Sequence, residues 1–70
     1  MEDIKIRFGR RLRELRLEKG WSQEKLANLA EIDRTYLPGI ESGKRNVSIV
    51  VVDKLSSVFS MEISDLVKGI

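Results

Sequence analysis

The segment Trp21–Ser48, WSQEKLANLAEIDRTYLPGIESGKRNVS, decides the fold of this chain. Three times, a residue that can cap a helix stands directly after one apolar residue and four positions before another. An oxygen of the capping side chain accepts a hydrogen bond from the first turn, and the two apolar residues pack together across the helix start. The three sets are Trp21, Ser22 and Leu26; Ile32, Asp33 and Leu37; and Val47, Ser48 and Val52. The pattern predicts helices that start directly after these three capping residues.

Apolar spacing outside this segment predicts two further helices. The first ends by Gly20, and its apolar stripe consists of Ile4, Phe8, Leu12 and Leu15. The last follows Ser64, and its apolar residues are Leu66, Val67 and Ile70. The helix after Ser48 is expected to run to about residue 59, and its core positions are Ile49, Val52, Leu55 and Phe59. Its IVVV run also suits a β-strand, but one strand would have nothing to pair with. The expected fold is therefore all-α, a compact bundle of five short helices.

Residues of about 22–42 are predicted to form a helix-turn-helix at the centre of a single domain that spans residues 1–70. About three residues, 30–32, join its two helices, and so short a connection favours a near-perpendicular crossing. The small Ala27 leaves room for the second helix, whose inner face carries Leu37 and Ile40. Ile32 supplies a buried aliphatic side chain in the turn.

Pro38 stands in an unfavourable place for the third helix. If Asp33 is the cap, Pro38 is the fifth helical residue, and its missing N–H removes a bond to the carbonyl of Arg34. An interior proline costs a regular helix about 3 kcal/mol. The sequence therefore predicts a short, bent helix and a gain in thermal stability when Pro38 is replaced by serine.

Composition limits the classes of function. The 70 residues include no cysteine and no histidine, which excludes disulfides and the usual zinc sites. The common nucleophile–base pairs of enzymes, which use these two residue types, are missing as well. No cofactor and no enzymatic activity are expected. No apolar run is long enough to span a membrane, and a cytoplasmic protein is expected. Residues 1–46 carry 11 Lys or Arg against 8 Asp or Glu, whereas residues 47–70 carry 2 against 3. This division suggests one surface for a polyanion and another for packing or pairing.

The chain resembles the helix-turn-helix regulators of the Cro and lambda-repressor class. The resemblance covers LRELRLEKGWSQEKLA, the helix-turn-helix itself and the trailing ISDLV. The strings DRTY, GIE and RN are most similar to the controller proteins of restriction–modification systems, which are small homodimers that bind their own promoter region. The resemblance implies a lambda-repressor-like fold. Its tight turn usually has glycine where this chain has Glu31, and a helix-ending glycine is common at Ser60, so both positions are expected to have positive φ.

A regulator of this class would read double-stranded DNA with the start of the third helix in the major groove. Arg34 can donate two hydrogen bonds to guanine O6 and N7, and Thr35 offers a hydroxyl and a methyl group. Tyr36 is the third candidate base contact, although it also suits a partly buried place against the apolar residues that pack across the start of the helix. The resemblance assigns a backbone contact to Gln23, where free N–H groups at a helix start also favour a phosphate. The loop after the third helix adds further candidate backbone contacts, which are Lys44, Arg45, Asn46 and Ser48.

The resemblance places a dimer interface in the last two helices, at about residues 49–70. This part of the chain also has more apolar residues than the core can bury, because at least one of the adjacent valines of the fourth helix must face outward. The expected interface residues are Val50, Val51, Met61, Ile63, Val67 and Ile70. Additional intrachain core is the alternative. A two-fold dimer would need a pseudo-palindromic operator with half-sites about 34 Å apart.

Three functions remain open at the level of sequence. The leading hypothesis is a transcriptional regulator of restriction–modification genes. The others are the antitoxin of a toxin–antitoxin pair and a module that binds only proteins. A contact with RNA polymerase is left open, with Glu24, Glu31 and Glu41 as acidic candidates on the surface.

Overall fold

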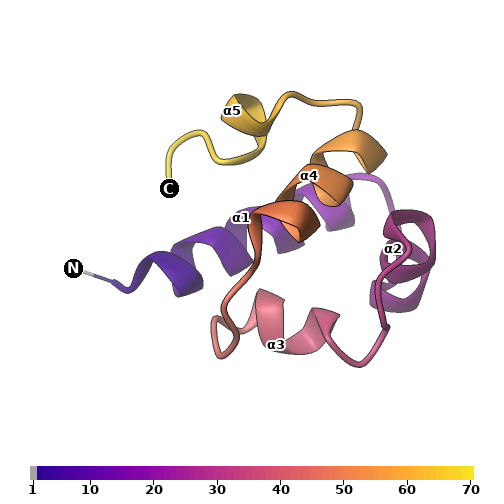
Figure 1. Ribbon diagram of the computed structural model, residues 1–70, viewed down its shortest axis with the longest axis horizontal. Coiled ribbons are helices and arrows are strands. Elements are labelled where there is room, and N and C mark those ends of the chain that lie inside the picture. The colour runs from indigo at the N-terminus through magenta and orange to yellow at the C-terminus, as the bar shows by residue number, and fades with distance from the viewer. Residues whose placement is uncertain (1) are drawn as a thin grey trace.

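The computed structural model describes residues 2–70, and within them the chain is helical without a strand. The helices are α1 (Ile4–Glu18), α2 (Gln23–Ala30), α3 (Leu37–Glu41), α4 (Ile49–Val58) and α5 (Ile63–Leu66). The long α1 crosses behind α4, α2 lies at the far end from the C-terminus, and α3 lies below α1 and α4 (Figure 1). The all-α prediction is confirmed, and the valine run forms helix. The last helix starts earlier than expected, at Ile63.

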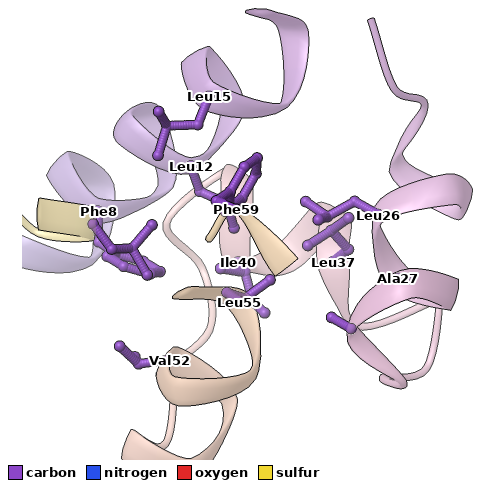
Figure 2. Packing of buried hydrophobic residues seen from close by; sticks show 12 residues of the cluster. Phe8, Leu12, Leu15, Leu26, Ala27, Leu37, Ile40, Val52, Leu55 and Phe59 are labelled. Atoms are coloured by element: carbon purple, nitrogen blue, oxygen red, sulfur yellow. The ribbon is translucent and has the colours of Figure 1, made fainter. Parts of the chain in front are cut away.

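All five helices contribute to one apolar core. Figure 2 shows the side chains converging between α1, α2, α3 and α4. The buried residues are Phe8, Leu12, Leu15, Leu26, Ala27, Ala30, Leu37, Ile40, Val52, Leu55, Phe59 and Leu66. The three apolar residues that precede the predicted caps, Trp21, Ile32 and Val47, pack against this cluster as expected. Trp21 also stacks on Phe59, with 5.5 Å between ring centroids.

Two of the three predicted caps are formed. The hydroxyl oxygen of Ser22 accepts from the backbone N–H of Lys25 at 3.0 Å, and that of Ser48 accepts from Val51 at 3.1 Å. These bonds satisfy N–H groups that have no partner inside their own helix. They fix the starts of α2 and α4 where the sequence predicted them.

The prediction for the third cap was wrong, because α3 begins at Leu37. The Asp33 carboxylate accepts from the N–H of Thr35 at 2.9 Å, and the N–H of Tyr36 donates to the Asp33 carbonyl at 3.0 Å. Aspartate side chains often close such local turns in competition with helix. The connection between α2 and α3 therefore spans residues 31–36 and is about twice as long as predicted.

Pro38 is consequently the second residue of α3, not an interior one. A first-turn residue has no helical acceptor for its N–H, so proline loses nothing there. We expect Pro38→Ser to lower the free energy of unfolding by about 0.5 kcal/mol, because proline restricts the unfolded chain. Thermal unfolding measures this, and a higher melting temperature would restore the view that Pro38 strains the helix.

Two apolar residues expected inside lie outside. Ile4 is 57% exposed and Ile49 is 69% exposed. Each is the first residue of its helix, and the buried faces begin one turn later, at Phe8 and Val52. Both side chains therefore lie beyond the edge of the core.

The predicted turn geometry is confirmed. Glu31 has φ of 57° and Ser60 has φ of 55°, in the left-handed region that usually favours glycine. Each follows a helix end and reverses the chain toward the next helix. Non-glycine residues there cost about 1 kcal/mol each.

Candidate nucleic-acid interface

The predicted base-reading residues lie on the turn before α3. Arg34 and Thr35 are exposed, and Tyr36 is half-buried at the residue that precedes the helix. The nearest ionic partner of Arg34 is Glu24, with 3.4 Å between Nη1 and Oε2. Because both side chains are mostly exposed, this pair constrains Arg34 weakly.

Thr35 is oriented by Asp33. Its hydroxyl donates to Asp33 Oδ1 at 2.8 Å, and its backbone N–H donates to the same oxygen. These bonds, the backbone one first, hold the pKa of Asp33 below its ordinary value. The lowered pKa favours the charged form of Asp33, and Thr35 remains exposed while its hydroxyl donates to this carboxylate.

Tyr36 links the turn to the loop after α3. Its phenol donates to the Asn46 carbonyl at 2.8 Å, and the Arg45 guanidinium lies 5.3 Å from the ring centroid. The ring also packs against the core, as its alternative interpretation required. The Arg45 side chain passes close to Gly39 on its way to Tyr36, and a Cβ at Gly39 would fall 2.8 Å from it. Arg45 is thereby held beside the turn.

The other loop residues lie as predicted on the exposed surface. Lys44 and Asn46 are exposed, and the Lys44 N–H donates to the Gly39 carbonyl at 2.9 Å. Ser48 is exposed as well, with its hydroxyl oxygen engaged in the cap of α4. The loop between α3 and α4 therefore places Arg45 over Tyr36 of the base-reading turn, and the exposed Lys44 is its neighbour in the chain.

Gln23 takes part in a buried polar cluster that the sequence interpretation missed. Glu41 accepts from Arg16 through two bonds, at 2.7 and 3.0 Å, and from Gln23 Nε2 at 3.0 Å. A third bond joins Arg16 Nη1 to the carbonyl of Trp21 at 2.8 Å. The pair is 10% and 4% exposed, and the bond to Glu41 raises the pKa of Arg16. The expectation that Glu41 lies on the surface was wrong.

The predicted interface residues divide into two groups. Val50 is 60% exposed, whereas five others are half-buried against the core: Val51, Met61, Ile63, Val67 and Ile70. Val67 and Ile70 line an open apolar hollow of about 350 Å³ together with Ile4 and Val47. The exposed Ile49 and Ile4 enlarge the apolar surface beyond the residues predicted.

Other kinds of site find no support in the described part of the chain. Residues 2–70 contain no group of acidic or other ligands able to hold a metal ion. No helix among them is long and apolar enough to cross a membrane.

The helix-turn-helix family pattern matches residues 12–66, which include all of α2, α3 and α4. The chain belongs to the helix-turn-helix family. Control protein C.MunI from a Mycoplasma species is 49% identical over 71 residues, covering 100% of this chain and 96% of the relative. Control protein C.BamHI from Bacillus amyloliquefaciens is 42% identical over 65 residues, covering 91% and 80%.

Solved structures give the same assignment. The restriction–modification controller C.AhdI from Aeromonas hydrophila superposes with a TM-score of 0.85 at 50% identity, over 89% of this chain and 94% of that one. C.Esp1396I, solved bound to a 25 base pair operator site, has a TM-score of 0.81 at 27% identity, over 96% and 92%. This helix-turn-helix protein is thus a restriction–modification controller, and the prediction of a regulator rather than an enzyme is confirmed.

Proposed function

We propose that this helix-turn-helix protein regulates restriction–modification genes by binding a pseudo-palindromic operator as a two-fold dimer. The observation that carries the proposal is the turn before α3, where Arg34 and Thr35 are exposed and the next residue, Tyr36, has Arg45 over its ring. The operator complex of the related C.Esp1396I supports the choice of ligand. Such a protein would act in the cytoplasm, where the DNA is.

Base reading is assigned to Arg34, Thr35 and Tyr36. Arg34 can donate two parallel bonds to guanine O6 and N7, and the Thr35 methyl group suits thymine. Tyr36 has its hydroxyl committed to Asn46, so its contribution is the edge of its ring.

Backbone contacts are assigned to the residues that flank the turn. Lys44 and Arg45 supply charge, and their phosphate contacts would release counterions from the duplex. Gln23, Asn46 and Ser48 would supply hydrogen bonds that set the register on the DNA.

The dimer is proposed to form through residues 49–70, while residues 22–42 bind DNA within the same domain. Its expected contacts are Val50, Val51, Met61, Ile63, Val67 and Ile70, and the exposed Ile49 extends them. Two copies so arranged would present their recognition turns about 34 Å apart. Of the three acidic candidates for a contact with RNA polymerase, Glu24 and Glu31 are exposed.

The proposal is tested by selecting from random duplex DNA at about 150 mM salt and sequencing the retained molecules. A two-fold motif with half-sites one helical turn apart is expected. Sedimentation at tens of micromolar should report a dimer. A folded protein that retains no motif would favour the antitoxin or protein-binding alternatives, and a monomer would reject the assigned interface.

Substitutions of Arg34 and Lys44 should separate base reading from charge. We expect Arg34→Ala to weaken binding about 10- to 100-fold and to relax the preference at one base pair in each half-site. Lys44→Ala should weaken all sequences equally and reduce the salt dependence by about two counterions, one for each subunit of the dimer. Titrations of matched and mismatched duplexes at several salt concentrations measure both effects. Equal losses on every duplex for Arg34→Ala would remove it from the base contacts.

A further inference from the structure

The Gln23 side chain, at the first position of α2, is held by a buried carboxylate. Its Nε2 lies 3.0 Å from Glu41 Oε1, and the Glu41 side chain is only 4% exposed. Glu41 is the last residue of α3, 18 positions further along the chain. The contact therefore joins the two helices of the helix-turn-helix beside the surface assigned to DNA.

The chemistry of the carboxylate fixes the orientation of the amide. A carboxylate can only accept hydrogen bonds, so the NH₂ end of Gln23 must face Glu41 and the carbonyl end must face away. One of the two N–H groups is used by Glu41, and the second is left for another acceptor. An open hollow of about 210 Å³ in front of this group is lined by Gln23, Glu41 and Arg13 among others.

Arg16 holds Glu41 in position and supplies the opposite charge beside it. Its guanidinium donates to both carboxylate oxygens, at 2.7 and 3.0 Å, and its third bond reaches the Trp21 carbonyl just before the cap of α2. A bidentate pair of this kind restricts the rotation of the carboxylate. An uncompensated carboxylate would repel a phosphate placed at Gln23, and the guanidinium cancels that charge.

We propose that Glu41 and Arg16 are positioning residues for operator binding, which hold the free N–H of Gln23 toward one phosphate. The inference rests on the proposed function, in which Gln23 contacts the DNA backbone. It assigns to this buried pair a role in affinity that neither side chain could have by touching DNA itself.

The test is a coupling measurement with the duplex recovered by selection. Gln23→Ala, the paired replacement Arg16→Met with Glu41→Leu, and all three changes together are compared with the unmodified protein. The paired replacement leaves the net charge unchanged and removes both buried charges, so long-range attraction to DNA stays the same. Thermal unfolding verifies that each variant is folded at the temperature of the titrations.

Gln23→Ala should weaken binding about 100-fold, since one bond to a charged phosphate is lost in each half-site. The paired replacement should weaken it about 5-fold, and the triple variant should bind within 2-fold of Gln23→Ala. A methylphosphonate at the contacted phosphate should reduce the affinity of the unmodified protein more than that of Gln23→Ala, which keeps only the backbone N–H groups of the helix start. Losses that multiply, or a paired variant that binds like the unmodified protein, would overturn the proposal.

A measurement without DNA separates this inference from the proposed function. The Gln23 side-chain amide should have a ¹⁵N order parameter above about 0.6 in the unmodified protein. A freely rotating amide would overturn the positioning role even if the paired variant failed to fold. Absence of any operator binding by the unmodified protein, with an ordered amide, would instead overturn the proposed function and with it the phosphate contact.

Discussion

Replacing Arg16 or Glu41 alone is expected to lower the free energy of unfolding by about 3–5 kcal/mol. Removal of one partner leaves the other charge buried between α1 and α3 without compensation. Arg16→Met also leaves the Trp21 carbonyl without the hydrogen bond from Arg16. It removes as well the guanidinium that holds Glu41, the acceptor of the Gln23 amide. Urea denaturation of the single variants measures the loss, which is a large share of the stability of a small domain.

The exposed pair Arg34 and Glu24 provides the matched control. Their side chains are 68% and 63% exposed, so Glu24→Ala should change stability by less than about 1 kcal/mol. Joint replacement of Arg16 and Glu41 by Met and Leu should recover most of the loss, since no unpaired charge remains. Single variants as stable as Glu24→Ala would show that the charge left without a partner is hydrated in the folded protein.

Gly9→Ala is expected to destabilise the protein by about 1–3 kcal/mol, although alanine favours a helix interior over glycine by up to about 1 kcal/mol. A Cβ at Gly9 would collide with the Ile40 carbonyl oxygen and would lie 2.5 Å from that of Glu41. Both atoms are backbone, so relief requires α1 and α3 to move apart. The opposite sign from helix propensity makes the result decisive, and thermal or urea unfolding measures it.

Gly20→Ala is the control for this substitution. Nothing lies within 4 Å of a Cβ there, and the only penalty is the positive φ of 72°, about 1 kcal/mol. We expect Gly9→Ala to be the more destabilising of the two and to weaken operator binding as well, because α3 would shift. A Gly9→Ala protein as stable as the unmodified one would mean that α1 and α3 cross less closely than described.

The sequence by itself determined the helical fold and most of the core. Capping residues between paired apolar residues act over a single turn, so Ser22 and Ser48 could be identified locally, and the buried Leu26, Val52 and Leu55 followed from helical spacing. The left-handed turns at Glu31 and Ser60 were predicted from the resemblance, because both residues stand where related regulators often have glycine.

The sequence left the start of α3 undecided, and tertiary structure alone decided the buried polar cluster. The Asp33 side chain could either cap a helix or close a turn, and the position of Pro38 made the turn the better choice for the folded chain. Arg16 and Glu41 each stand four residues after a core leucine, Leu12 and Leu37, and this spacing with opposite charges was the available signal. Only the crossing of α1 over α3, permitted by Gly9, brings the two charges together and makes their burial favourable.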